Sequence, residues 1–213
     1  MSHIAVVDLG TGNLHSVGKA LEKVAAKKKI EITSDPNVIA SASHVVLPGQ
    51  GAMGSWFRAL DHHDLRSAVI NALSICPVLG ICLGLQALYS YSDEDGGTTG
   101  LGVMSGNVRK FPINQRVDNE CLKVPHMGWN RVEQRLPHPL WRGIEDGTRF
   151  YFVHSYYAYS DRVSEVAGLT DYGFSFVSAA AYSNVFAVQF HPEKSHEQGL
   201  MLLRNFVLWN GES

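Results

Sequence analysis

The chain has few cysteines, no excess of charge of one sign and no long hydrophobic run. Its three cysteines are few and odd in number, and none forms a Cys-x-x-Cys pair, so neither a disulfide framework nor a zinc site is expected. With 18 Lys and Arg against 20 Asp and Glu, the net charge of −2 gives no support for nucleic-acid binding. No apolar run approaches membrane-spanning length. We therefore expect no metal, nucleic-acid or membrane partner.

What remains is the composition of an ordinary globular protein, with 45% hydrophobic and 18% charged residues. A chain of 213 residues can bury one sizeable core, so we expect a single domain over residues 1–213. Residues 1–8 have the pattern of a first strand and not of a basic, apolar and cleavable leader. Together with the low cysteine content, this predicts a cytoplasmic protein.

The first half of the chain alternates strand and helix patterns. Apolar strands are expected over 4–7, 30–33, 45–47 and 78–81. Helices are expected over 14–24, from Pro36 for a short stretch, and over 65–75. The Lys27–Lys29 run is interpreted as a solvated helix end. This βαβ repetition predicts a parallel sheet covered by helices.

The second half has a different pattern. Strand-like runs cover 106–111, 149–154, 166–170, 174–180 and 185–190. They predict mixed or antiparallel additions to the sheet, and an apolar stripe over 200–209 predicts a terminal helix. The expected fold class is therefore α/β, with a central, mostly parallel but mixed sheet flanked by helices.

The most informative segment is Gly-x-Cys-x-Gly at residues 80–84, where an apolar strand runs into Cys82 and an apolar helix leaves it. This is the layout of a nucleophile elbow, with cysteine in place of serine. The flanking glycines allow a strained strand-to-helix turn, and the start of a helix favours the thiolate. The alternative is a buried structural cysteine, since free cysteines are among the most buried residues.

A cysteine nucleophile needs a base and a group that orients the base. His191 and Glu193 follow the apolar run 185–190, and a spacing of two in extended chain places both side chains on one face. A single histidine at a strand end is often structural, but His-x-Glu after a buried strand is more specific. We expect His191 to take the thiol proton and Glu193 to orient the imidazole.

Acyl transfer also needs hydrogen-bond donors for a developing oxyanion. The backbone N–H of Leu83 is the usual first donor, and the turn at Gly49, Gln50 and Gly51 is a candidate for the second. Loops at the carboxyl ends of parallel strands share one sheet edge, which would bring this turn to the elbow. No cofactor is expected, because the third glycine of a dinucleotide-binding pattern starting at Gly10 would fall on His15.

The sequence resembles the class I (triad) glutamine amidotransferases. The segments that carry this resemblance are the elbow and His191-Pro192-Glu193. Other segments are similar to the glutaminase subunits of imidazole glycerol phosphate synthases, over nearly the whole chain. These segments lie at residues 8–14, 123–130, 151–157 and 189–195. The resemblance implies hydrolysis of glutamine through a cysteinyl thioester. It also implies transfer of the ammonia to a TIM-barrel cyclase, which makes imidazole glycerol phosphate and AICAR in histidine biosynthesis.

The resemblance also implies roles for single residues. Cys82, His191 and Glu193 match the triad, and Gly49, Gln50, Gly51 and Leu83 match the oxyanion site. Positions near bound glutamine are matched by Gln86, Ser155 and Tyr156. Positions at the cyclase interface are matched by Asn13, Trp129, Tyr151 and Lys194.

Two other functions stay open on the residues alone. The same triad would serve a stand-alone cysteine hydrolase acting on γ-glutamyl peptides. A non-catalytic binding subunit is the third hypothesis, against which an intact Cys82, His191 and Glu193 argue.

Overall fold

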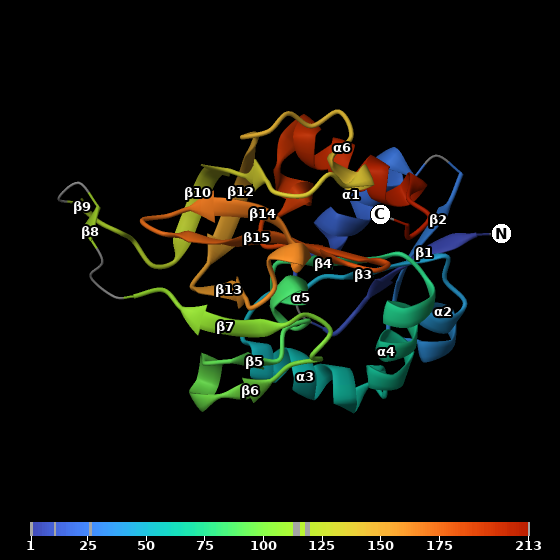
Figure 1. The fold of residues 1–213 in the computed structure, drawn as a ribbon. Coiled ribbons are helices and arrows are strands. Elements are labelled where there is room, and N and C mark those ends of the chain that lie inside the picture. The colour runs from blue at the N-terminus through green and yellow to red at the C-terminus, as the bar shows by residue number, and fades with distance from the viewer. Residues whose placement is uncertain (1, 11, 26, 113–115, 118–119, 213) are drawn as a thin grey trace.

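The structure, a computed structural model, describes residues 2–10, 12–25, 27–112, 116–117 and 120–212. A twelve-stranded sheet passes through the molecule (Figure 1). Five neighbouring strands pair in parallel, in the order β2 (Lys29–Thr33), β1 (His3–Val7), β3 (His44–Leu47), β4 (Val78–Ile81) and β16 (Val185–Val188). The carboxyl ends of β3, β4 and β16 therefore meet at one edge.

Beyond β16 the sheet continues mainly in antiparallel pairs, so it is mixed as expected. The added strands are β15 (Ser175–Tyr182), β13 (Tyr156–Ser160), β7 (Gly106–Lys110), β5 (Tyr91–Ser92), β6 (Thr98–Thr99), β14 (Val166–Asp171) and β11 (Glu133–Gln134). Two small antiparallel sheets stand apart, namely β10 (His126–Arg131) with β12 (Arg149–His154), and β8 (Arg116–Val117) with β9 (Glu120–Cys121).

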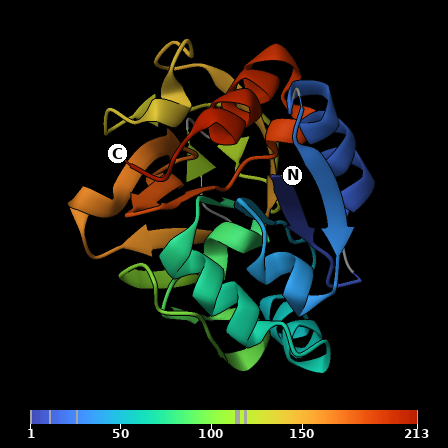
Figure 2. The ribbon, with the colours of Figure 1, turned by 90° about the vertical axis from the view of Figure 1, so that its right-hand side faces the viewer.

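Helices cover both faces of the parallel strands (Figures 1 and 2). In β1, Ile4 and Val6 belong to one apolar cluster with the long helices α1 (Leu14–Val24) and α6 (His196–Leu208). Ala5 and Val7 belong to the cluster on the other face, with α3 (Met53–His62) and α4 (Arg66–Ile75). The short α2 (Pro36–Ala40) packs beside α4. Alternation along a strand thus divides the core into two layers.

Several elements were not expected from the sequence. Helix α3 buries Met53, Trp56, Phe57 and Leu60, which is helical spacing that the glycine-rich turn before it obscured. Strands β10 and β13 were also missed, because neither forms a buried apolar run: β10 alternates between exposed and more buried residues, and Ala158 alone is fully buried in β13. The structure ends β16 at Val188, two residues before the expected end.

The interpretation of Lys27–Lys29 as a solvated helix end is wrong, because α1 ends at Val24 and Lys29 is the first residue of β2. The Lys28 ammonium donates to the carbonyl of Val207, at the end of α6, over 2.7 Å. Burial lowers the pKa of Lys28. Beside it, Nε2 of His44 lies 2.9 Å from the carbonyl of Trp209. Lys28 therefore caps the terminal helix, where free carbonyls favour a cation.

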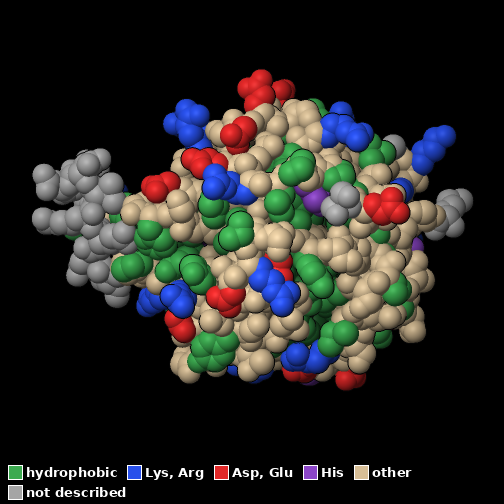
Figure 3. Space-filling view, in the orientation of Figure 1, with side chains coloured by type: hydrophobic (Ala, Val, Ile, Leu, Met, Phe, Trp, Pro, Cys, Tyr) green, Lys and Arg blue, Asp and Glu red, His purple; other side chains and the backbone are tan. Residues whose placement is uncertain are grey.

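On the face shown in Figure 3, acidic and basic side chains are interspersed, as the small net charge suggests. Among the described residues, no helix has the length and apolar character needed to cross a membrane.

Candidate active site

Cys82 sits on a strained turn between β4 and the helix α5 (Leu83–Gln86). Its φ and ψ are 55° and −106°, a backbone conformation that side-chain-bearing residues rarely adopt. A Cβ on Gly84 would overlap the carbonyl oxygen of Leu47, and one on Gly80 would come within 2.9 Å of the Ala187 Cβ. The two glycines therefore let the elbow pack against β3 and β16, as the pattern predicted.

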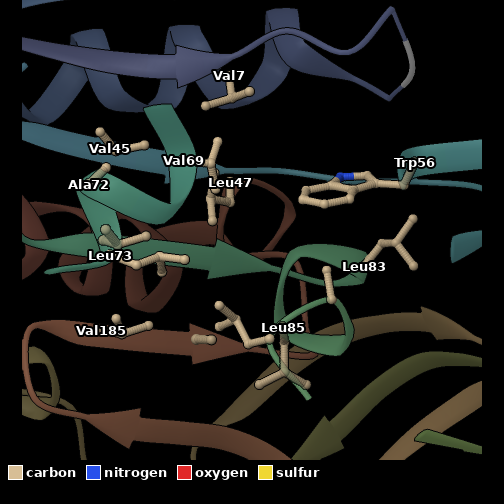
Figure 4. Packing of buried hydrophobic residues seen from close by; sticks show 14 of the residues in the cluster. Val7, Val45, Leu47, Trp56, Val69, Ala72, Leu73, Leu83, Leu85 and Val185 are labelled. Atoms are coloured by element: carbon tan, nitrogen blue, oxygen red, sulfur yellow. The ribbon is translucent and has the colours of Figure 1, made fainter. Parts of the chain in front are cut away.

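The helix expected after the nucleophile is present and short. α5 has four residues and passes into turns at Ala87 and Leu88. Leu83 and Leu85 enter the core cluster that contains Leu47 and Trp56, which holds the turn in place (Figure 4). The Cys82 N–H donates to the carbonyl of Val188 over 2.8 Å, so β16 supports the elbow directly.

His191 and Glu193 are paired as predicted, but not by an extended chain. Their side chains are 2% and 1% exposed, and Nδ1 of His191 lies 2.8 Å from Oε1 of Glu193. Glu193 belongs to the one-turn helix η4 (Pro192–Lys194), so the turn after His191 carries the carboxylate back to the imidazole. Because a carboxylate only accepts, Nδ1 carries a proton in either protonation state of His191, and Nε2 is the nitrogen that gains or loses one.

The environment of His191 favours the protonated imidazole. Burial by itself lowers the pKa of His191, but the charge and hydrogen-bonding capacity of Cys82, together with Glu193, raise it to about 10. Among the described residues, Nε2 has no hydrogen-bond partner of normal geometry. The Cys82 side chain comes first among the groups that raise the pKa of His191, so the thiol and the imidazole interact.

One backbone hydrogen bond and the Ser195 hydroxyl fix His191 against strand β12. The His191 N–H donates to the carbonyl of Tyr151 over 2.9 Å. The Ser195 hydroxyl donates to the carbonyl of His191 over 2.6 Å and accepts from the Tyr151 N–H at 3.0 Å. Ser195 is 1% exposed, and no local pattern in the chain indicated this role.

The glycine-rich turn after β3 lies at the elbow, as expected from the sheet edge. A Cβ on Gly49 would come within 2.8 Å of the Leu83 Cβ, and the Trp56 indole holds the Pro48 carbonyl over 3.1 Å. No hydrogen bond within the described residues uses the backbone N–H of Gln50, Gly51 or Leu83. These donors remain free for a ligand.

A cavity of about 390 Å³ lies over the elbow. Its walls include every expected catalytic residue except Glu193, which lies behind His191. All three residues expected near glutamine also line it. The walls are Gln50, Gly51, Cys82, Leu83, Gln86, Glu94, Pro125, Val153, His154, Ser155, Tyr156, His191 and Lys194. The volume suits a small, polar amino-acid side chain with its backbone groups.

Two residues that sequence reasoning missed also belong to the site. Gln189 is fully buried, and its amide nitrogen lies 3.6 Å from the Cys82 sulfur. Its Oε1 accepts from the Gln86 amide over 2.9 Å. Glu94, in the one-turn helix η1 (Glu94–Gly96), lines the cavity, and burial raises its pKa. Gln189 could have been suspected from the sequence, because it lies two residues before His191. Glu94 lies in a loop whose sequence does not indicate a role in the site.

Three of the four expected interface residues gather at the rim of the site. Trp129 is 43% exposed, stacks on His196 at 5.0 Å and meets the Tyr151 ring edge-on at 6.0 Å. The Lys194 ammonium lies 6.0 Å from the centre of the Tyr151 ring. Asn13 is separate from them. It caps α1 and borders a small hollow that reaches Gln50, His191 and Glu193.

The other two cysteines lie outside the site. Cys76 is buried, and burial raises the pKa of its thiol to about 11, while Cys121 is exposed in β9. Within the described residues, no three His, Cys, Asp or Glu side chains come together as metal ligands would.

A strained cysteine elbow, a buried histidine–carboxylate pair and free backbone donors beside one cavity define an acyl-transfer site on an α/β fold. The glutamine amidotransferase class-I family model matches residues 5–209. The chain therefore belongs to the class-I glutamine amidotransferases. Solved structures described as glutamine amidotransferases share the fold, with TM-scores of 0.67 and, for a Thermotoga maritima protein, 0.63. Each is 17% identical, and they cover 96% and 90% of this chain and 97% and 76% of their own.

Sequence similarity is far higher to one group within this class. The imidazole glycerol phosphate synthase subunit HisH of Aromatoleum aromaticum is 53% identical over 211 residues, covering 98% of this chain and 99% of its own. The same subunit of Thiobacillus denitrificans is 54% identical over 209 residues, covering 97% and 91%. Within its class, the chain belongs to the HisH family.

Proposed function

We propose that this chain is the glutaminase subunit of an imidazole glycerol phosphate synthase in histidine biosynthesis. It hydrolyses L-glutamine to glutamate and ammonia. The observation that carries the proposal is the placement of Cys82 and His191 on the wall of one cavity, with Glu193 buried behind the imidazole. A merely structural cysteine needs neither a strained elbow nor a charged partner.

The reaction follows from the geometry of these groups. His191 holds the proton of Cys82, and the thiolate attacks the side-chain carboxamide carbon of glutamine. The tetrahedral oxyanion accepts hydrogen bonds from the N–H of Leu83 and from the turn at Gly49, Gln50 and Gly51. His191 gives its proton to the leaving nitrogen. The tetrahedral intermediate then collapses, the C–N bond breaks, ammonia departs, and the acyl group stays on Cys82 as a thioester.

Water then completes the cycle. His191 takes a proton from the water as its oxygen attacks the thioester carbon. Collapse of the second oxyanion breaks the C–S bond, and the proton returns to Cys82 as glutamate leaves. Glu193 keeps the imidazole oriented and stabilises its charge in both halves.

Charge and hydrogen-bonding capacity around the cavity suit the rest of glutamine. The Glu94 carboxylate complements the α-ammonium group. The Gln86 amide nitrogen is already engaged by Tyr156 and Gln189, which leaves its Oε1 to accept from the substrate. Ser155 and Tyr156 contact the substrate from the opposite wall.

We further propose that the partner is a TIM-barrel cyclase that receives the ammonia. Met127 and Trp129 are 60% and 43% exposed on the outer side of β10, beside Tyr151 and Lys194 at the cavity rim. Exposed aromatic anchors next to a charged side chain are typical of interface centres. Asn13 would contact the same partner from the α1 side. We also propose that residues 1–213 form one domain and that the protein acts in the cytoplasm.

The experiment separates glutamine from γ-glutamyl peptides as substrate. Release of ammonia or amine is followed for each, with and without a cyclase and its nucleotide ligand. We expect turnover of glutamine that rises when the cyclase is present. Equal or faster hydrolysis of γ-glutamyl peptides by the isolated chain would support a stand-alone hydrolase instead. Absence of Cys82 labelling by a glutamine-like electrophile would favour a non-catalytic subunit.

A further inference from the structure

Two buried histidines that the mechanism does not use face each other beside the cavity. His126 of β10 and His154 at the end of β12 are directly opposed in the strand pairing. Nδ1 of His126 lies 2.9 Å from Nε2 of His154. The His126 ring stacks on Phe152 at 4.9 Å and packs against Tyr172 at 4.1 Å. Both imidazoles are thus held in fixed orientations.

The hydrogen bonds around this pair run in only one direction. Nδ1 of His154 lies 2.7 Å from the carbonyl of Tyr156, which can only accept, so this nitrogen carries the proton. In a neutral imidazole Nε2 of His154 then accepts from Nδ1 of His126. Nε2 of His126 in turn accepts from the Asn130 amide at 3.3 Å. Asn130, His126, His154 and the Tyr156 carbonyl form a directed chain of three hydrogen bonds.

Burial keeps both members neutral. It lowers the pKa of His126 to about 4. For His154, burial and the nearby charges of His126 and His191 together lower the pKa to about 3, against the opposing effect of the hydrogen bond to Tyr156. A second proton on either ring would place an N–H on an Nε2 that accepts a hydrogen bond, so that two donors would face each other and that bond would be lost. One arrangement of protons is therefore fixed at neutral pH.

The inner end of this chain reaches the nucleophile. The Tyr156 carbonyl also accepts from the Gln86 amide nitrogen at 3.0 Å. That nitrogen is shared with Oε1 of Gln189, whose own amide lies 3.6 Å from the Cys82 sulfur. A shift of the Tyr156 carbonyl would thus change the orientation of both glutamine amides.

The outer end lies on the strand that carries the exposed rim. Along β10, His126, Gly128 and Asn130 are the more buried residues, and Met127, Trp129 and Arg131 are exposed. Neighbouring residues of a strand point to opposite faces. A protein that docks on Met127 and Trp129 therefore contacts the same strand from which the side chains of His126 and Asn130 extend inward.

We propose that His126 and His154 are positioning residues that set the Tyr156–Gln86 wall of the glutamine cavity and carry to it the docking of the partner on β10. The proposal rests on the proposed function. Docking that moves β10 changes the geometry of the Asn130–His126 bond, and the directed chain transmits the change to the Tyr156 carbonyl. The effect falls on glutamine binding and on its stimulation by the partner. Use of external ammonia by the complex is not affected.

The test compares His126→Phe with His126→Asn in the complex with the cyclase. Phenylalanine keeps the ring stacked on Phe152 but leaves Nε2 of His154 without a donor. Asparagine places an amide N–H near the position of Nδ1 and restores that donor. We expect His126→Phe to raise KM for glutamine and to lower the stimulation by the cyclase ligand by about tenfold or more, since small misplacements at a site have such effects. His126→Asn should recover most of both.

The outcomes are distinguishable. Unchanged KM and stimulation in His126→Phe would overturn the proposal, as would equal losses in the two variants. If the wild-type complex itself shows no glutaminase activity, the proposed function has failed instead. Ammonia-dependent synthesis reports that each complex assembles. Should His126→Phe not fold, Asn130→Ala at a partly exposed position removes the first donor, and an unchanged KM there would also overturn the proposal.

Discussion

At the scale of single residues, the catalytic imidazole is subject to opposing influences. Burial lowers the pKa of His191, whereas Cys82 and Glu193 raise it to about 10. A general acid that must protonate a leaving amine benefits from this balance, because the imidazolium persists at neutral pH. The carboxylate of Glu193 does more than fix a tautomer, since it also provides the negative charge beside a buried cation.

Glu193→Gln tests this role. The amide keeps the size of the side chain but removes its charge, so the pKa of His191 should fall and the Cys82 thiolate lose its partner. We expect kcat for glutamine to decrease by about 10²- to 10⁴-fold in the complex, with ammonia-dependent synthesis retained. The pH dependence of kcat is the measurement, and Glu197→Gln on exposed α6 is the control. A decrease below threefold would show that the charge is dispensable.

The positions of these candidate residues could be predicted from the sequence because each belongs to a short local pattern. Cys82 lies between two glycines, and His191 and Glu193 are two positions apart. Gln189 was harder to predict, since an amide within an apolar run has no chemistry of its own until folding brings it to the sulfur. Glu94 was not predictable, because a turn-rich surface loop gives no indication that one carboxylate enters a cavity.

At the scale of elements, the strand-to-helix turn depends on the absence of a side chain at Gly84. We expect Gly84→Ala to lower the free energy of unfolding by about 3 kcal/mol or more, because its Cβ would overlap the Leu47 carbonyl and push the elbow off β3. Displacement of Cys82 should also reduce glutaminase turnover. Urea denaturation and steady-state kinetics measure the two effects.

Gly143→Ala provides the matched control. Gly143 has a φ of 75°, but the atoms nearest to an added Cβ lie 3.8 Å and 4.0 Å away, in the Met201 side chain. Only backbone strain of roughly 1–2 kcal/mol is expected there, with activity unchanged. Equal denaturation midpoints for the two variants would contradict the close-approach explanation for Gly84.

Elements differed in how well the sequence predicted them. All five parallel strands were located. Four of them, β1, β3, β4 and β16, contain continuous buried apolar runs, whereas the edge strand β2 alternates Ile30 and Ile32 with polar residues. Strand β10 was missed because its more buried residues, His126, Gly128 and Asn130, are not apolar and break up any apolar run. The pairing of β10 with β12 joins segments separated by a long connection, so the contact between His126 and His154 could not be inferred from spacing.

At the scale of the whole molecule, four buried neutral histidines make stability depend on pH. Burial lowers the pKa of His44, His126 and His138 from 6.5 to about 4 and that of His154 to about 3. Between these values and 6.5 the unfolded chain binds more protons than the folded protein. The free energy of unfolding should therefore fall as pH decreases from about 6.5 towards 4, by up to about 1.4 kcal/mol per pH unit for each histidine.

His138→Asn isolates one of these contributions. Nδ1 of His138 accepts from the Leu140 N–H at 3.2 Å, and an asparagine oxygen can replace that acceptor without titrating. We expect a shallower loss of stability between pH 6.5 and 4, measured by urea denaturation at several pH values. His62→Asn, on an exposed surface, should leave the slope as in the wild type. An unchanged slope in His138→Asn would show that His138 is not held neutral by burial.

In the proposed function, Cys82 begins an ammonia transfer that ends in another subunit. The most direct measurement compares glutamine-dependent and ammonia-dependent synthesis of imidazole glycerol phosphate by a complex of the cyclase with the Cys82→Ala chain. We predict that glutamine-dependent synthesis is lost while ammonia-dependent synthesis continues at the wild-type rate. Loss of both activities, or survival of the glutamine-dependent one, would contradict the claim.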